Sequence, residues 1–309
     1  MSALTFVILP VFLVIGLGYL AVWKLRFPAE GADMLMSFAQ SYAIPVLLFM
    51  AMTRLDLALG FQLALLVPFY AGAFTGFLAG VFGARFLFRR DWEDAVVIGF
   101  CAAFSNSLLL GLPITERAYG ADALTGNYAI IALHAPSLLT IGIVVMELVR
   151  ARGAPLAALP KRVAKGVFSN GLIIGILSGL VVNITGLSLP QVLIDGADLV
   201  ARAGLPAALF ALGGVLVRYK PEGDLRIALF ICALSLGLHP LITFTLGNAF
   251  GLGQDGLRSA TITAAMAPGI NTYIFAHMYS RAKRVAASAV LLATGLTMLT
   301  ALGWLTLLP

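Results

Sequence analysis

Two short polar segments with helix-breaking residues stand out in an otherwise apolar chain. Proline removes a backbone donor and glycine permits unwound backbone, so each segment is expected to free amide and carbonyl groups. Each segment also carries an asparagine, which supplies a side-chain donor and acceptor. Freed polar groups are costly at membrane depth unless they line a cavity or meet a ligand, so they predict a substrate-binding site. The residues are Ser105, Asn106, Gly111 and Pro113, and then Pro268, Gly269, Asn271 and Thr272.

A simple proline kink, with the asparagine bonded to a neighbouring helix, is the alternative for either segment taken alone. Tyr42, three residues before Pro45, is a further candidate contact, and an interhelical hydrogen bond explains it equally well. His134, His277 and Glu116 are candidates for a titrating group. Histidine changes charge near neutral pH, although a neutral histidine bonded between two helices remains an open alternative.

The composition places these residues in a membrane. The 309-residue chain is 61% hydrophobic and 11% charged, whereas soluble proteins average about 25% charged residues. Its net charge of +6 fits basic loops beside a membrane, and no basic tract indicates nucleic-acid binding. Cys101 and Cys232 lie far apart in apolar segments and form no metal signature or disulfide framework. We expect a polytopic membrane protein without a cofactor, in which the lipid bilayer is the main surrounding partner.

Ten charge-free segments divide almost the whole chain, and each is expected to be a helix because lipid forces internal hydrogen bonding. Nine reach the roughly 20 residues needed to cross the bilayer, and the seventh is expected to borrow residues around Asp198 and Arg202. The first segment lacks a preceding basic region, which favours a retained helix over a signal peptide. The segments are 3–23, 34–53, 57–84, 95–115, 123–146, 166–194, 203–217, 227–254, 259–280 and 285–309.

The distribution of lysine and arginine predicts the orientation of the chain. Connections that follow odd-numbered helices hold 16 of these residues, and the remaining connections hold 4. Basic loops stay in the cytoplasm, so both termini are expected on the extracytoplasmic side.

An internal repeat with an offset of about 161 residues divides the chain into five helices plus five. Residues 43–49 align with residues 204–210, so that Pro45 and Phe49 fall at the same positions as Pro206 and Phe210. At the same offset, Gly18 aligns with Gly179. Five helices per copy make the second copy enter the membrane from the other side. Such inverted repeats are typical of secondary transporters, with sites where broken helices meet. The expected units are 1–150, a cytoplasmic linker 151–165, and 166–309; chance similarity between apolar segments is the alternative.

At these residues the chain resembles the auxin efflux carrier family. Residues 106–113, followed by Tyr119 and Gly120, are similar to the family's Asn-x-x-x-x-Gly-x-Pro segment in helix 4. Residues 269–276 together with Tyr279 resemble the counterpart in helix 9, and the segment that ends at Phe49 fits helix 2. The family includes bacterial malonate transporters, which implies a location in the cell (inner) membrane.

The resemblance implies a ten-helix fold similar to the bile acid–sodium symporters, in which broken helices 4 and 9 cross. Helices 1, 2, 6 and 7 are then a scaffold and the contact of a homodimer, while helices 3–5 and 8–10 are a mobile transport unit. Such a unit carries substrate by an elevator-type alternating-access mechanism. Thr272 stands where plant members have a proline, and only about twenty residues join the halves. We therefore expect neither the loop regulation of plant members nor auxin as substrate.

Half-helices that begin at mid-membrane breaks favour an anion, because their amides and positive dipole ends point into the site. The sequence thus favours a secondary active transporter for a small organic anion, a carboxylate, with proton or sodium as the coupling ion. A sodium-coupled symporter of the bile-acid type for another organic anion remains an alternative. An intramembrane enzyme lacks a convincing catalytic set at depth, and a channel would need rings of polar residues.

Overall fold

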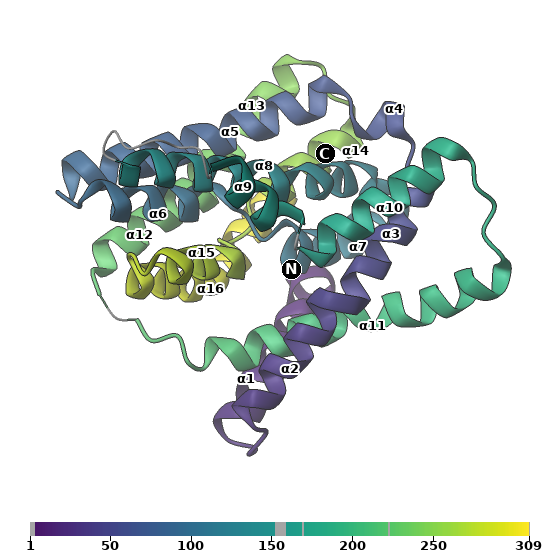
Figure 1. The fold of residues 1–309 in the computed structure, drawn as a ribbon, viewed down its shortest axis with the longest axis horizontal. Coiled ribbons are helices and arrows are strands. Elements are labelled where there is room, and N and C mark those ends of the chain that lie inside the picture. Colours follow the sequence, from purple (N-terminus) through teal and green to yellow (C-terminus); the bar gives the residue numbers. More distant parts are fainter. Residues whose placement is uncertain (1–3, 152–158, 169, 222, 309) are drawn as a thin grey trace.

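The computed structural model describes residues 4–151, 159–168, 170–221 and 223–308, and their regular elements are all helices (Figure 1). No β-strand occurs in these ranges, where Ser105 and Pro268 form an isolated antiparallel bridge. The prediction of an all-helical membrane protein is confirmed. Much of the expected linker, residues 152–158, lies outside the described residues.

Within the described part, seven helices are long and apolar enough to cross a membrane. The expected segment 166–194 holds only the 15-residue helix α10 (Gly171–Thr185) before the next helix begins. The expected segments 95–115 and 259–280 are each divided between shorter helices. The seven are Thr5–Trp23, Ala29–Arg54, Leu57–Leu87, Ala121–Ala151, Gln191–Leu216, Leu225–Ala249 and Lys283–Leu307.

Several of the long spans contain more than one helix label in Figure 1, because π-helical turns interrupt the regular α-helix. The first eight labelled helices are α1 (Leu9–Trp23), α2 (Ala29–Phe38), α3 (Ile44–Arg54), α4 (Leu57–Gly60), α5 (Leu63–Phe82), α6 (Trp92–Ala103), α7 (Leu112–Tyr119) and α8 (Thr125–Ala151). The remaining ones, besides α10, are α9 (Leu159–Phe168), α11 (Gln191–Leu216), α12 (Leu225–Ala233), α13 (His239–Ala249), α14 (Gln254–Ala264), α15 (Ile270–Tyr279) and α16 (Lys283–Leu307).

Polar residues between the apolar segments set where helices begin and end. The side chains of Asp91, Asn170 and Asp224 each accept a hydrogen bond from a backbone N–H in the first turn of α6, α10 and α12. Such caps satisfy donors that no helical carbonyl can reach. Gly186, with φ of 66°, ends α10 in the left-handed conformation that glycine adopts readily.

Helix α11 begins earlier than its charge-free stretch. Asp195 and Asp198 lie inside the helix, one and two turns after Gln191. The Arg202 Nε donates to the Asp198 Oδ2 over 2.8 Å, one turn apart on the same helix face. Pairing lowers the cost of charges in an otherwise apolar span. The prediction that the seventh helix borrows residues around Asp198 and Arg202 is confirmed.

The helices form two groups that Figure 1 separates clearly. In one group, α1 packs along α11 and α3 packs along α10, and in the other α5 packs against α6 and α13. Glycine allows the close contacts of α1 with α11 and of α3 with α10. A Cβ on Gly18 would lie 1.9 Å from the carbonyl oxygen of Phe210. A Cβ on Gly179 would lie 2.5 Å from the carbonyl oxygen of Phe49. Small residues at such positions let helix backbones approach closely in membranes.

Candidate functional site

Two non-helical connectors interrupt the helices where the sequence carries its polar segments. The first comprises residues 104–106, between α6 and a π-helical turn, Ser107–Gly111, that leads into α7. The second comprises residues 265–269, between α14 and α15. We refer to them as connector 1 and connector 2.

The two connectors are hydrogen-bonded to each other. The Asn106 backbone N–H donates to the Ala267 carbonyl over 2.7 Å, and the Gly269 N–H donates to the Phe104 carbonyl over 3.0 Å. These two bonds form the isolated bridge between Ser105 and Pro268. Each connector therefore satisfies part of the other's unwound backbone, which an apolar environment requires.

The first interruption lies earlier than the sequence indicated. Gly111 and Pro113 are both buried in helical backbone and do not lie at the break itself, and the Gly111 N–H donates to the Asn106 carbonyl over 3.1 Å. In the π-helical turn the Leu112 N–H reaches back to the carbonyl of Ser107. Helix α7 continues this turn without a break, so Pro113 lies in helical backbone and supplies no N–H to the carbonyls of the preceding turn.

A central cavity of about 50 Å³ lies where the connectors meet. That volume exceeds the roughly 10–15 Å³ needed for one water molecule. Ser105 and His134, 2% and 1% exposed, both line it, and the Ser105 hydroxyl and the His134 ring nitrogens have no hydrogen-bond partner among the residues that the structure describes. Buried polar atoms without partners indicate a place where water or a ligand binds. The other polar residues of the lining are Gln40, Asn106, Ser107 and Asn271.

Two of the predicted residues support the connectors themselves. The Asn106 Oδ1 accepts the Leu109 N–H over 3.3 Å and so caps the π-helical turn. The Thr272 hydroxyl donates to the Gly269 carbonyl over 2.7 Å, and Thr272 is fully buried away from the cavity lining. Asn106 therefore holds the connector and faces the cavity at once, whereas Thr272 has only the first role.

A larger inner cavity of about 800 Å³ adjoins the central cavity, and both are lined by Gln40 and Asn271. Its wall carries Arg150 and Lys165 together with Glu147. Glu147 is 9% exposed and accepts a hydrogen bond from the Tyr279 hydroxyl over 3.4 Å. It is therefore not the solvated helix end that its position in the sequence indicates.

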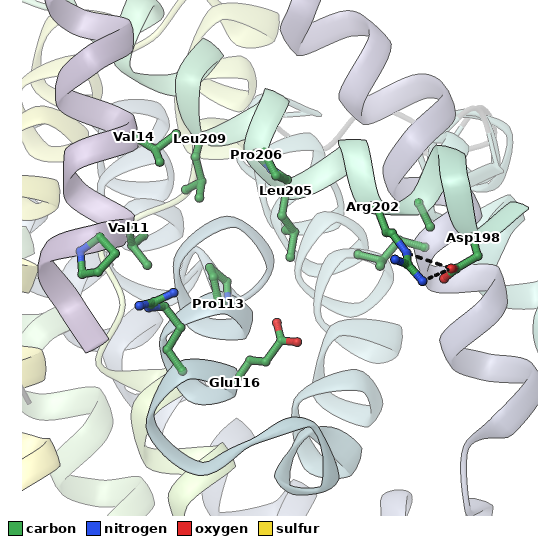
Figure 2. Close-up of a pocket in the computed structure, with 13 residues that line it drawn as sticks. Val11, Val14, Pro113, Glu116, Asp198, Arg202, Leu205, Pro206 and Leu209 are labelled. Carbon is green, nitrogen blue, oxygen red and sulfur yellow. Dashed lines mark hydrogen bonds and ion pairs between the residues drawn. The ribbon is translucent and has the colours of Figure 1, made fainter. Parts of the chain in front are cut away.

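An outer cavity of about 450 Å³ lies between α1, α3, α7 and α11 and shares no lining residue with the central cavity. Figure 2 shows the Glu116 carboxylate directed into it and the ion pair between Asp198 and Arg202 at its edge. Arg117 also lines it, and its Nη2 donates to the Phe6 carbonyl over 2.7 Å. The structure thus places Glu116 in a different cavity from the connectors.

Two predicted residues lie away from all three cavities. Tyr42 is 65% exposed and lines none of them, whereas Gln40, two residues earlier in the same π-helical turn, lines both the central and the inner cavity. His277 is exposed near the end of α15, where its ring lies 6.2 Å from that of Tyr273. Gln40 was missed because its single polar side chain in an apolar span gives no motif.

A second buried histidine lies close to His134. The His239 Nε2 is 3.1 Å from the Phe69 carbonyl oxygen, and His239 is fully buried. The Phe69 ring packs against both imidazoles, at 5.5 Å from His134 and 4.9 Å from His239 between ring centroids. The pair therefore joins α5, α8 and α13 immediately behind the central cavity.

Comparison with known proteins identifies the family of the chain. The model of a family described as membrane transport protein, which is the auxin efflux carrier family, matches residues 4–305. The chain belongs to this family. It is therefore a membrane transporter of the auxin efflux carrier family, and the predicted resemblance is confirmed.

Two relatives resemble the chain over most of its length, and a third resembles about a third of it. The "Putative malonate transporter" of Rhizobium meliloti (strain 1021) is 23% identical over 312 residues, which cover 100% of this chain and 97% of that protein. The uncharacterized transporter YfdV of Escherichia coli (strain K12) is 25% identical over 88% of this chain and 87% of its own length. Auxin efflux carrier component 4 of Arabidopsis thaliana is 31% identical over 35% of this chain and 18% of its own.

Proposed function

We propose that this transporter is a secondary active carrier for a small organic anion, which binds where the two connectors meet. The observation that carries the proposal is the convergence of two helix N-termini on one cavity that also contains buried polar groups without partners. The turn that begins at Ser107 and helix α15, which begins at Ile270, both contribute residues to the central cavity. Backbone N–H groups and the positive ends of helix dipoles at such points attract an anion.

The inner cavity supports a carboxylate substrate. Its wall carries two cations, Arg150 and Lys165, and one carboxylate, Glu147, a balance that favours an anion by electrostatic steering. Asn271 lines both cavities and supplies a side-chain amide that can donate to a carboxylate. The name of the Rhizobium meliloti relative makes malonate the first dicarboxylate to test. A dicarboxylate is larger than the central cavity, so one of its ends would extend into the inner cavity.

The glycine contacts support a ten-helix inverted repeat made of units 1–150 and 166–309, joined by linker 151–165. Gly18 of the first unit meets Phe210 of the second, and Gly179 of the second meets Phe49 of the first. Both residues of each contact are related by the same offset of 161. We therefore assign α1, α2, α3, α10 and α11 to a scaffold and the remaining long helices to a mobile unit that works as an elevator.

The cavities support an inward-facing conformation. The central cavity shares residues with the inner cavity and none with the outer cavity. Arg150 and Lys165 belong to the connections that hold 16 of the 20 basic residues, so the inner cavity faces the cytoplasm under the positive-inside rule. In this orientation both termini lie outside the cell (inner) membrane. Labelling of Gln40→Cys from the inside and Glu116→Cys from the outside tests the orientation, and the reverse pattern contradicts it.

We favour coupling of substrate transport to protons, with His134 as the group that carries the proton. His134 lines the central cavity, whereas Glu116 lies in the outer cavity and His277 lies outside the cavities. A sodium-coupled symporter is the second candidate, since free carbonyls and asparagine oxygens of the connectors can coordinate sodium. Uptake driven by a sodium gradient at constant pH would favour this second candidate.

The binding test uses the purified protein with a panel of mono- and dicarboxylates. A ligand of the folded state raises the melting temperature by mass action, and sodium or pH dependence of the rise identifies the coupling ion. We expect at least one dicarboxylate to raise it and Asn271→Ala to abolish the rise. A panel without effect, beside a positive response to neutral or cationic metabolites, would contradict an anion substrate. The particle mass in detergent tests the homodimer that we expect through the scaffold.

A further inference from the structure

A small basic cavity lies apart from the transport site, between the end of α11 and the beginning of α16. It has a volume of about 150 Å³ and shares no lining residue with the central, inner or outer cavity. Its lining consists of Arg218, Tyr219, Lys220, Tyr273, Lys283, Arg284 and Ala287. All four cations belong to the connections that the positive-inside rule places in the cytoplasm.

The basic cavity has more cationic side chains than carboxylate groups paired with them. Arg218 is paired, since its Nη1 donates to the Asp33 Oδ2 over 2.9 Å. Lys220, Lys283 and Arg284 have no carboxylate partner among the described residues. Three like charges around one small space repel each other, so a bound anion would stabilise the arrangement.

The walls of the cavity are fixed by packing. The rings of Tyr219 and Tyr273 lie 4.8 Å apart between centroids, and Tyr219 is 7% exposed. The Ser288 hydroxyl donates to the Lys220 carbonyl over 3.2 Å, which ties the chain after α11 to α16. The backbone segments that carry the cations are therefore held together around a preformed space.

We propose that the basic cavity binds an anionic phosphate group, either in the headgroup of an acidic phospholipid of the cytoplasmic leaflet or as a free phosphate ion. Arginine and lysine are suited to phosphate oxygens, and basic pockets between membrane helices on the cytoplasmic side bind acidic headgroups. About 150 Å³ is some ten times the space that one water needs, which leaves room for a tetrahedral oxyanion.

The position of the site gives binding a consequence, which rests on the proposed function. Arg218 and Lys220 follow α11, which we assign to the scaffold, whereas Tyr273, Lys283 and Arg284 belong to α15 and α16 of the mobile unit. A phosphate bound between them stabilises the inward-facing conformation. The binding itself does not depend on this assignment.

The experiment measures the melting temperature of the full-length protein in a neutral detergent. The probes are inorganic phosphate, short-chain dihexanoyl phosphatidylglycerol, and dihexanoyl phosphatidylcholine as a lipid without net charge. Stabilisation by phosphatidylglycerol alone assigns the site to a lipid, and stabilisation by inorganic phosphate as well assigns it to phosphate in general. The Lys283→Gln/Arg284→Gln variant should bind about tenfold more weakly or worse, since it removes two charge-assisted contacts.

The matched control is Lys24→Gln/Lys161→Gln, which removes two exposed lysines from the same predicted side. It should bind the probes as the wild type does. If the control loses as much affinity as the cavity variant, general surface charge explains the binding and the site is wrong. Failure of both anionic probes to stabilise the wild type also overturns the proposal. If the double variant does not fold, Lys220→Gln is the second variant to test. Dicarboxylate binding is measured in each variant as well, because loss of phosphate binding with dicarboxylate binding retained separates this site from the transport site.

Discussion

Gly18 lies so close to Phe210 that a Cβ on the glycine would stand 1.9 Å from the phenylalanine carbonyl oxygen. Real side chains do not reach such distances, so α1 and α11 must separate to admit even a methyl group. The contact between Gly179 and Phe49 repeats this relationship 161 residues further along the chain, with 2.5 Å between the same kinds of atom. The sequence repeat therefore corresponds to a repeated physical contact.

We predict that Gly18→Ala destabilises the protein because the added methyl overpacks the contact between α1 and α11. Overpacking of this kind costs about 1–3 kcal/mol. The measurement is the melting temperature in detergent. Gly16→Ala is the matched control in the same helix, since nothing lies within 4 Å of a Cβ at Gly16. Equal melting temperatures for the two variants would show that the α1–α11 contact is looser than described.

The sequence predicted the helical segments well because their signal is local. Charge-free stretches depend on neighbours in the chain, so most of the seven long spans agree with expectation to within a few residues. The exceptions are α11, which begins earlier than its charge-free stretch, and the three expected segments that form no long span. The break at connector 1 was predicted too late in the chain, because its position depends on contacts with connector 2. The bonds from Asn106 to Ala267 and from Gly269 to Phe104 join positions far apart in sequence. No local pattern reports them.

Acidification should weaken an ion-pair cluster at the start of α6. The Glu93 Oε2 accepts from the Arg281 Nε over 2.9 Å and from the Arg150 Nε over 3.1 Å. The hydrogen bond from Arg281, against the opposing effect of desolvation and with support from Arg150, holds the pKa of the Glu93 carboxyl below its ordinary value. A lowered pKa gives stability that is present above the unfolded-state value and lost as pH falls through the folded-state value.

We therefore predict that Glu93→Gln lowers the melting temperature at neutral pH by the equivalent of about 1 kcal/mol. The difference from the wild type should disappear as the pH falls below the ordinary glutamate pKa of about 4.3. Melting curves of both proteins between pH 7 and pH 3 measure it. A difference that stays constant over that range would mean that the carboxylate charge contributes nothing.

Transport by the wild type should respond to a proton gradient, and His134→Gln should remove that response. His134 is buried, lines the central cavity and is the histidine nearest to the two connectors. The control is His277→Gln, because His277 is exposed on α15. Uptake into liposomes with and without an imposed pH difference provides the readout. An unchanged response in His134→Gln would exclude this histidine from coupling.

The candidate site was only partly accessible from the sequence. Asn106 and Asn271 face the central cavity, but Gln40 beside them carries no motif and Tyr42 two residues later faces outward. Both residues lie in the π-helical turn Ala39–Ala43 between α2 and α3, so the direction of each side chain depends on how that turn packs. Ser105, by contrast, was found because it adjoins the asparagine.

The central claim is that a small organic anion binds at the connectors and is carried across the membrane. Counterflow of labelled malonate, and of each other carboxylate that raises the melting temperature, into liposomes that contain purified protein tests it most directly. We predict concentrative entry with the wild type, loss with Asn271→Ala and normal entry with Asn248→Ala, an exposed asparagine on α13. Entry that survives in Asn271→Ala, or no entry of any anion that binds, would contradict the claim.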